Sequence, residues 1–256
     1  PAATACVPAP TSSPFSPDLS NPPDAVKDAP AYKVIFTGAL TATEGWHNLA
    51  VTGGPIVTVD GIPVAPDSAN WIYLNPSNDV VMEVYHAVYH EVYGGAPSLS
   101  ISWPAAPTCP GQVVAVYQFP DANPRQAVTV ECETGPTDGG FSRTAPDFPA
   151  VLGSGPFIAR YSGHLVVNPS GWFRFSGSAP EGDRLNLLVN NEDMLPEYDP
   201  GGYLELAEGS HPFAVQYVHE SNETAGFALG WERFTCPTGS FLGAYYVGAE
   251  AAGRAD

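Results

Sequence analysis

The sequence predicts an all-β protein made of two tandem antiparallel β-sandwich domains. Three observations predict it. The 256 residues include 28 Pro and 26 Gly, which divide the chain into segments too short for long helices. Several stretches alternate apolar and polar residues, as half-buried strands of an antiparallel sheet do. Short sequence motifs of the first half also recur in the same order in the second half, and we call these motifs landmarks. We therefore expect two copies of one fold.

Four stretches show the alternation that predicts strands, namely 49–51, 56–59, 99–101 and 213–217. Gly-Gly, Asp-Gly, Asn-Pro-Ser and Pro-Gly-Gly sequences bound them, and such sequences favour turns. Trp103 and Trp231 end the last expected strand of each copy, where we expect core positions. The proline-rich opening segment 1–31 is expected to run as an extended strap over the first copy, held by Cys6.

The two copies are related by an internal repeat of about 127 residues. The order of the landmarks predicts domains at 1–110 and 111–238, followed by an extra strand or tail at 239–256. The matching landmarks are Val34-Ile-Phe-Thr-Gly38 with Ala159-Arg-Tyr-Ser-Gly163, Gly45-Trp46 with Gly171-Trp172, and Val59-Asp60-Gly61 with Val189-Asn190-Asn191.

Four cysteines, Cys6, Cys109, Cys132 and Cys236, follow the same period and permit three pairings. The repeat favours Cys6 with Cys109 and Cys132 with Cys236, because equivalent cysteines should form equivalent bonds. Each disulfide would then close one sandwich. The alternative, Cys109 with Cys132 and Cys6 with Cys236, would tie the ends together. The even count indicates an oxidising, extracellular location, and we expect that a signal peptide has been removed.

A formal net charge of −18 repels phosphate backbones and anionic lipid, so nucleic acid and membrane surfaces are not expected partners. No apolar run is long enough to cross a bilayer. Neutral glycans and cations remain as candidate ligands. We expect no enzymatic activity and no required cofactor, because the sequence contains no Gly-x-Ser-x-Gly elbow and no His-Glu-x-x-His motif. The scattered Asp and Glu residues single out no pair for glycoside hydrolysis.

The richest polar loop is 190–199, which holds six carboxylate and amide side chains within ten residues. Calcium prefers such oxygen ligands, but the spacing matches no calcium-loop template, and a solvated acidic loop is the alternative. The metal candidates are Glu192, Asp193, Glu197 and Asp199.

Trp46 and Trp172 each follow a turn glycine, where a tryptophan either stacks on a sugar or enters the core. The candidate ligand-binding residues are Trp46, Asp60, Trp172, Asn190, Asn191, Glu192 and Asp193. Asn222-Glu-Thr224 is a glycosylation sequon, with Asn222 as the acceptor in a eukaryotic secretory host.

Two segments of the second copy carry a family resemblance, Leu206-Ala-Glu-Gly-Ser-His-Pro-Phe-Ala-Val-Gln-Tyr217 and Leu229-Gly-Trp231. They resemble the protective-antigen-type (PA fourteen, GLEYA-like) β-sandwich. The first copy contributes Gly45-Trp46-His47, Val59-Asp60-Gly61 and Leu99-Ser-Ile-Ser-Trp103. The resemblance covers most of both repeats. It implies an extracellular module, often glycan-binding, found in adhesins, toxins and accessory parts of glycosidases. Calcium-dependent adhesins of the family carry two adjacent aspartates in the loops that match 52–55 and 180–183, and this sequence has no such pair there.

Modules of the family open with a Gly-apolar-x-Ala-x-Tyr strand, which segments 111–117 and 239–246 resemble. The first copy has no such strand ahead of it. We therefore expect either part of a longer tandem array, or a filament in which residues 239–256 of one chain complete the first sandwich of the next. In a third alternative, this tail packs on its own second domain.

Together these features predict a secreted or cell-surface structural or adhesive protein. The alternatives are a carbohydrate-binding module and an accessory region of a secreted glycoside hydrolase. The expected partners are neutral glycans or copies of the chain itself.

Overall fold

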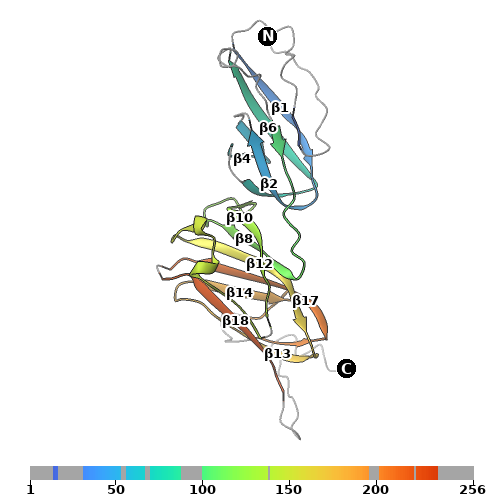
Figure 1. Cartoon of the computed structure of the whole chain (residues 1–256), viewed down its shortest axis with the longest axis vertical. Coiled ribbons are helices and arrows are strands. Elements are labelled where there is room, and N and C mark those ends of the chain that lie inside the picture. The colour runs from blue at the N-terminus through green and yellow to red at the C-terminus, as the bar shows by residue number, and fades with distance from the viewer. Residues whose placement is uncertain are drawn as a thin grey trace, which may run out of the picture.

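The computed structural model describes residues 14–16, 31–52, 56–66, 70–87, 100–137, 139–195, 202–221 and 223–235. They form two antiparallel β-sandwiches that follow one another along the long axis of the molecule (Figure 1). The all-β class and the antiparallel sheets predicted from the sequence are confirmed. In the described ranges, no helix is long and apolar enough to cross a membrane.

The first sandwich packs a sheet of order β1-β6-β3-β4 against one of order β7-β2-β5-β9. Its core collects inward side chains such as Leu49, Val59, Ile72 and Ile101. Trp103, 5% exposed, belongs to this core as predicted. Its strands are β1 (Ala31–Thr41), β2 (Gly45–Thr52), β3 (Ile56–Val59), β4 (Ile62–Val64), β5 (Asn70–Leu74), β6 (Ser77–Ala87) and β7 (Ser100–Ser102), with β9 (Gln126–Ala127) added from farther along the chain.

The second sandwich packs a sheet of order β10-β8-β12-β17-β14-β15 against one of order β11-β18-β13-β16. Aromatic rings fill its core, with Tyr161, Phe213 and Phe227 around Phe141. Its elements are β8 (Gln112–Gln118), β10 (Thr129–Thr134), β11 (Gly140–Thr144), the 3₁₀ helices η1 (Ala145–Asp147) and η2 (Ala150–Leu152), β12 (Phe157–Val167), β13 (Gly171–Ser178), β14 (Arg184–Val189), β15 (Glu192–Asp193), β16 (Tyr203–Leu206), β17 (Gly209–His219) and β18 (Gly226–Arg233).

The strand orders of the two sandwiches correspond. The order β1-β6-β3-β4 matches β12-β17-β14-β15, and β7-β2-β5 matches β18-β13-β16. Phe15, from the opening segment, bridges to Ile101 of β7, as Phe141 of β11 pairs with Leu229 of β18. This is a correspondence of strand order, and the repeat of about 127 residues in the sequence stays a prediction. Strand β8 has no counterpart beside β1 among the described residues.

The disulfide pairing favoured by the repeat is wrong, because the structure joins Cys109 to Cys132, with 5.4 Å between the Cα atoms. The reason is strand adjacency. Cys109 lies in the turn that leads into β8, and Cys132 lies on β10, which pairs with β8 along its length. The disulfide therefore links two neighbouring strands of one sheet and does not close a whole sandwich. Cys6 and Cys236 lie outside the described residues.

Candidate functional site

The two sandwiches meet at a joint built by the loop between β8 and β10. The Tyr73 amide of β5 donates a hydrogen bond of 2.8 Å to the Arg125 carbonyl. Trp71 and Ile72 then pair with Ala127 and Gln126 of β9. A segment that lies in the predicted second domain thus adds a strand to a sheet of the first sandwich.

The Arg125 side chain closes this joint. Its Nη1 donates to Asp60 Oδ2 at 2.8 Å, and its Nε and Nη2 donate to the Tyr73 carbonyl at 2.9 and 2.7 Å. Nη2 also donates to Asn78 Oδ1 at 3.1 Å. Asn78 is 1% exposed and is held by the Asn75 backbone at 3.0 and 2.7 Å. The planar guanidinium thereby engages three rigid groups of the first sandwich with charge-assisted hydrogen bonds.

The loop that carries Arg125 is shaped by its own sandwich. Gln118, at the end of β8, is 3% exposed and donates to the carbonyls of Pro124 and Gln126 at 3.0 and 2.6 Å. Asn123 Oδ1 accepts from the Arg125 amide at 2.9 Å. The backbone on both sides of Arg125 is therefore held by its own sandwich, which reduces the backbone entropy that is lost when the side chain contacts the first sandwich.

Two of the predicted ligand residues, Trp46 and Asp60, lie at this joint. Asp60 has φ 49° and Gly61 has φ 77°, and together they form the two-residue turn between β3 and β4 that favours such dihedrals. Trp46 packs edge-on against Tyr73, with ring centroids 5.6 Å apart. The Asp60 carboxylate is engaged by Arg125.

The corresponding residues of the second sandwich are Trp172 at the start of β13 and the turn Asn190–Asn191, with φ 52° and 65°. Asn190 Nδ2 donates to His211 Nδ1 at 3.2 Å. The other ring nitrogen, Nε2, donates to the Ala207 carbonyl at 2.8 Å. In strand register, His211 faces Leu165 as Asn78 faces Leu40. Asn190 and His211 therefore hold the places that Asp60 and Asn78 have at the joint.

The metal candidates do not converge in the part of the chain that the structure describes. Asp193 accepts hydrogen bonds from the Leu195 amide at 2.9 Å and from Asn186 Nδ2 at 3.2 Å, and Glu192 is exposed. No group of three or more His, Cys, Asp or Glu among the described residues could hold a metal ion. Glu197, Asp199 and the sequon residue Asn222 lie outside the described residues.

Asp183, in the loop that precedes β14, is buried and fully engaged. Its side chain is 0% exposed. Oδ2 accepts from His219 Nδ1 at 2.9 Å and from the Tyr217 hydroxyl at 2.5 Å. Oδ1 accepts from the amides of Glu220 and Ser221 at 3.0 and 2.9 Å. Burial raises the pKa of the Asp183 carboxyl, but these four hydrogen bonds outweigh it and hold the pKa well below its usual range.

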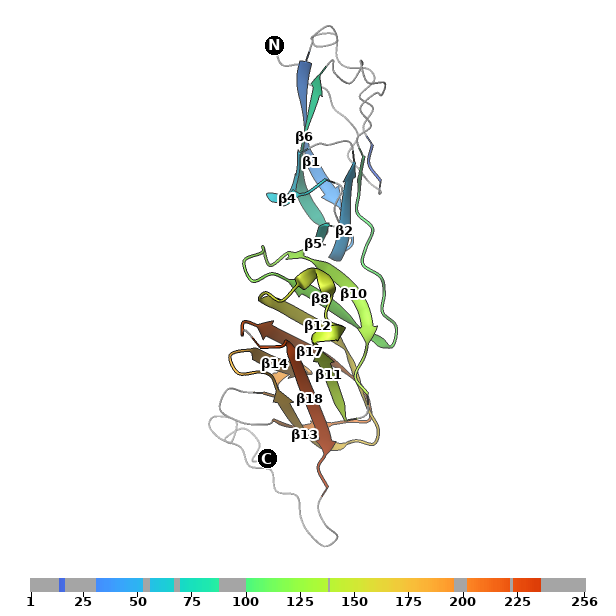
Figure 2. The same ribbon diagram turned by 60° about the vertical axis from the view of Figure 1, so that its left-hand side comes forward.

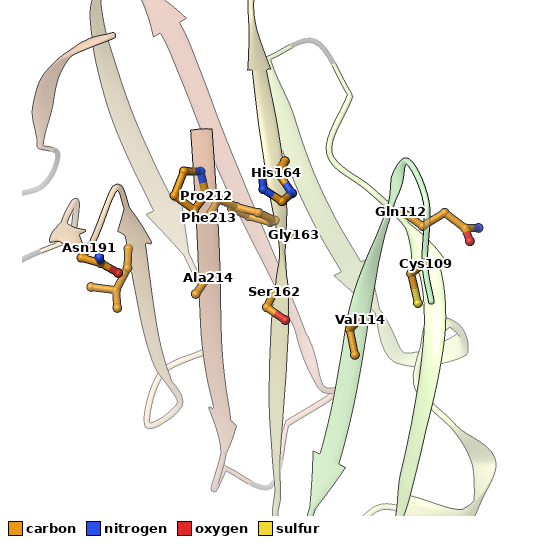
Figure 3. Close-up of a pocket in the computed structure, with 11 residues that line it drawn as sticks. Cys109, Gln112, Val114, Ser162, Gly163, His164, Asn191, Pro212, Phe213 and Ala214 are labelled. Carbon is orange, nitrogen blue, oxygen red and sulfur yellow. The ribbon is translucent and has the colours of Figure 1, made fainter. Parts of the chain in front are cut away.

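A pocket of about 440 Å³ lies over the outer face of the six-stranded sheet (Figure 3). Its floor is a row of direct neighbours across four strands, Val114, Ser162, Ala214 and Leu188. Gln112, His164 and Asn191 also line it, and Figure 3 shows Gln112 and Asn191 on its opposite sides. A floor of small side chains with hydrogen-bonding groups around it suits a small neutral ligand. Of the predicted ligand residues, Asn191 lines this pocket.

Sequence reasoning missed both Arg125 and the Asp183 cluster. One signal was available for Arg125, because the chain has only 9 Lys and Arg against 27 Asp and Glu. In so acidic a chain, each Lys or Arg side chain has many carboxylates with which it could form an ion pair. No periodic pattern marks the loop that carries it.

The sequence matches no protein-family model and no curated protein, so the resemblance to protective-antigen-type sandwiches stays a prediction. Among solved structures, an anti-sigma factor domain-containing protein is 19% identical, with a TM-score of 0.37 over 78% of each chain. Another, from Clostridium clariflavum, is 14% identical, with a TM-score of 0.34 over 86% of each chain. A β-glucosidase from Kluyveromyces marxianus is 17% identical, with a TM-score of 0.38 over 48% of this chain and 14% of that chain. At these TM-scores the likeness carries no argument.

Proposed function

We propose that this chain is a structural module of a secreted or cell-surface protein, in which two sandwiches are held at a fixed spacing as a stiff rod. The observation that carries the proposal is the joint. Strand β9 continues a sheet of the first sandwich, and the Arg125 side chain makes four hydrogen bonds to that sandwich. A joint made of sheet pairing and a planar ionic fork resists both bending and twisting, unlike a flexible linker.

The disulfide and the net charge are also compatible with a structural protein outside the cytoplasm. A disulfide persists in oxidising compartments, and the structure contains one between Cys109 and Cys132. A net charge of −18 favours solubility and disfavours sideways association between copies. The proposed role needs no catalytic group, metal or cofactor.

Small-angle X-ray scattering of a dilute, monomeric sample tests the proposal. The wild-type protein should give the scattering profile of one elongated body, independent of salt from low to moderate ionic strength. Arg125→Ala should broaden the distance distribution because the sandwiches then pivot about β9. The matched control is Arg174→Ala, which removes a 46% exposed guanidinium whose ion pair to Glu232 is 3.9 Å long. A wild-type profile that fits only a mixture of bent and straight forms would remove the basis of the proposal.

A second candidate function is binding of a neutral glycan, and the pocket over Ser162 and Ala214 is the observation that favours it. Polar groups at opposite sides of a small-residue floor suit the hydroxyl groups of a sugar ring. A glycan array, with and without calcium, is the direct test. Ser162→Phe should fill the pocket and abolish any binding, while Ser176→Phe on the exposed face of β13 should not. Binding that is unchanged by Ser162→Phe would exclude this pocket.

A further inference from the structure

We propose that the edge of β1 that faces away from β6 is a docking site for residues 239–246 of a second copy of this chain, which pair there as β8 pairs with β12. This inference extends the structural role proposed above from one rod to a head-to-tail assembly of rods.

The template is the edge of β12 in the second sandwich. Strand β8 runs antiparallel along it, from Ile158 opposite Gln118 to Ser162 opposite Val114. Gly163 follows directly after this paired stretch. A Cβ added at Gly163 would lie 2.9 Å from Val113 Cγ1 and 3.3 Å from the Gln112 carbonyl oxygen, so the neighbouring strand would have to shift to admit a side chain there.

Among the described residues, no strand occupies the corresponding place beside β1. Strand β1 is the outer strand of its sheet among the described residues, with β6 as its hydrogen-bonded neighbour. Gly38 corresponds to Gly163, since it faces Val80 of β6 as Gly163 faces Phe213 of β17. A Cβ added at Gly38 would have no atom of another described residue within 4 Å. The first sandwich thus keeps the glycine that admits a close strand, while its described residues supply no such strand.

The apolar character of β1 supports the same conclusion. Ile35 is 48% exposed, although it lies in the middle of an eleven-residue strand. Exposed apolar side chains and unpaired backbone groups on a long edge strand favour strand addition. Pairing with another strand would satisfy those backbone groups and would cover part of this surface.

Residues 239–246 have the sequence that the vacant place requires. Gly239-Ser-Phe-Leu-Gly-Ala-Tyr245 follows the pattern of Gly111-Gln-Val-Val-Ala-Val-Tyr117. In β8 the inward residues Val113, Ala115 and Tyr117 are each 0% exposed. Their counterparts are Phe241, Gly243 and Tyr245, which repeat the order large, small, tyrosine.

The donor must come from another copy. Figures 1 and 2 place β1 and the C-terminal end of β18 in opposite halves of the elongated molecule. Only four peptide steps separate Thr235 from Gly239, and they span at most about 14 Å. The second sandwich lies between the two places, and a strand the length of β18 alone extends about 26 Å. Residues 239–246 therefore cannot reach β1 of their own chain.

The residues that follow this segment also match the joint. Arg125 comes 125 − 111 = 14 residues after Gly111, and Arg254 comes 254 − 239 = 15 residues after Gly239. Asn190 and His211 hold the places of Asp60 and Asn78 on the second sandwich. A chain that adds its 239–246 segment to the next copy would bring Arg254 near this end of its own second sandwich. The contact between copies would then repeat the joint within each copy.

Sedimentation velocity of the full chain over a range of concentrations tests the docking. The wild type should form a ladder of oligomers. Gly38→Val should raise the concentration needed for assembly by about tenfold or more, because the added methyl groups would overlap the incoming strand. Ala39→Val is the control, since it places the same valine side chain at an exposed neighbour on the opposite face. A wild type that stays monomeric throughout, or a Gly38→Val variant that assembles like the wild type, would overturn the proposal.

A photo-crosslinking amino acid at Leu242 identifies the donor. In a mixture of isotopically light and heavy copies, it should link to β1 of a different copy, and the link should disappear with Tyr245→Asp. Links to the same copy, or to a segment other than β1, would overturn the docking. The circular dichroism spectrum and melting temperature of Tyr245→Asp should match those of the wild type, which separates loss of docking from misfolding. The scattering experiment on the monomer tests the stiff rod independently of this docking, because it probes the joint within one copy.

Discussion

The Arg125 guanidinium lies 2.8 Å from the Asp60 carboxylate, although the two residues are 65 positions apart and belong to different sandwiches. Three more hydrogen bonds from the same side chain end on Tyr73 and Asn78. Because one side chain makes all four of these hydrogen bonds across the joint, its removal has defined consequences.

Arg125→Ala should uncouple the unfolding of the two sandwiches. We expect a loss of about 1–3 kcal/mol in the free energy of unfolding of the first sandwich, since charged hydrogen bonds to Asn78 and Asp60 are lost. Differential scanning calorimetry should then show two transitions in place of one. Arg125→Lys should restore part of the loss, because an ammonium cannot reproduce the bidentate fork. A single unshifted transition in Arg125→Ala would show that the side chain does not couple the sandwiches.

Asp183→Asn should destabilise the second sandwich by about 3–5 kcal/mol, because the amide keeps only one acceptor oxygen. Its NH2 group must then face one of the two pairs of donors that the carboxylate accepts from. Urea unfolding followed by tryptophan fluorescence measures the loss. Glu220→Gln is the control, since the Arg184–Glu220 ion pair has side chains 70% and 46% exposed and should contribute little. Equal effects of the two variants would contradict the role given to Asp183.

The stability of the second sandwich should fall on acidification. The pKa of Asp183 is lower in the folded protein than its unfolded value of about 3.9. Its contribution is therefore complete above about pH 5 and is lost as the pH falls through the folded pKa. Unfolding free energies measured from pH 6 to 2 should show this slope in the wild type. The slope should be smaller in Asp183→Asn, and parallel curves would rule out Asp183 as its source.

Peptide mapping without reduction should recover Cys109 linked to Cys132. This bond has a sequence separation of 23 and should stabilise the folded state by roughly 3 kcal/mol in the chain-entropy model. The double variant Cys109→Ser with Cys132→Ser should lower the melting temperature accordingly. Recovery of Cys6 linked to Cys109 would instead support the pairing expected from the sequence repeat.

The fold class followed from local signals, and the joint did not. Alternation in 56–59 and 213–217 predicted strands that are present as parts of β3 and β17, because the period-two pattern records which face is buried. The turn at Asp60 was visible in its Asp-Gly sequence. Strand β9 has two residues, too few for any periodic signal. The Arg125 contacts depend on how two sandwiches dock.

The disulfide shows where inference from a repeat fails. Equivalent positions in a repeat predict equivalent bonds only if each cysteine faces the same neighbour. Cys132 lies on β10 beside β8, and the pairing of these two strands brings it next to Cys109. The Cys109–Cys132 disulfide therefore follows from the adjacency of two strands within one sheet. The ligand residues expected at Trp46 and Asp60 were likewise placed on the correct turn and strand, but the sequence did not show that a second sandwich meets them there.

The most direct test of a stiff rod is the distance distribution between spin labels, one on each sandwich. Labels at Ile56, 57% exposed, and Val166, 72% exposed, avoid the joint and both cores. Pulsed electron paramagnetic resonance of diluted protein should give one narrow distance peak in the wild type. The peak should broaden in Arg125→Ala and stay narrow in Arg174→Ala. A broad wild-type distribution that Arg125→Ala leaves unchanged would contradict the account.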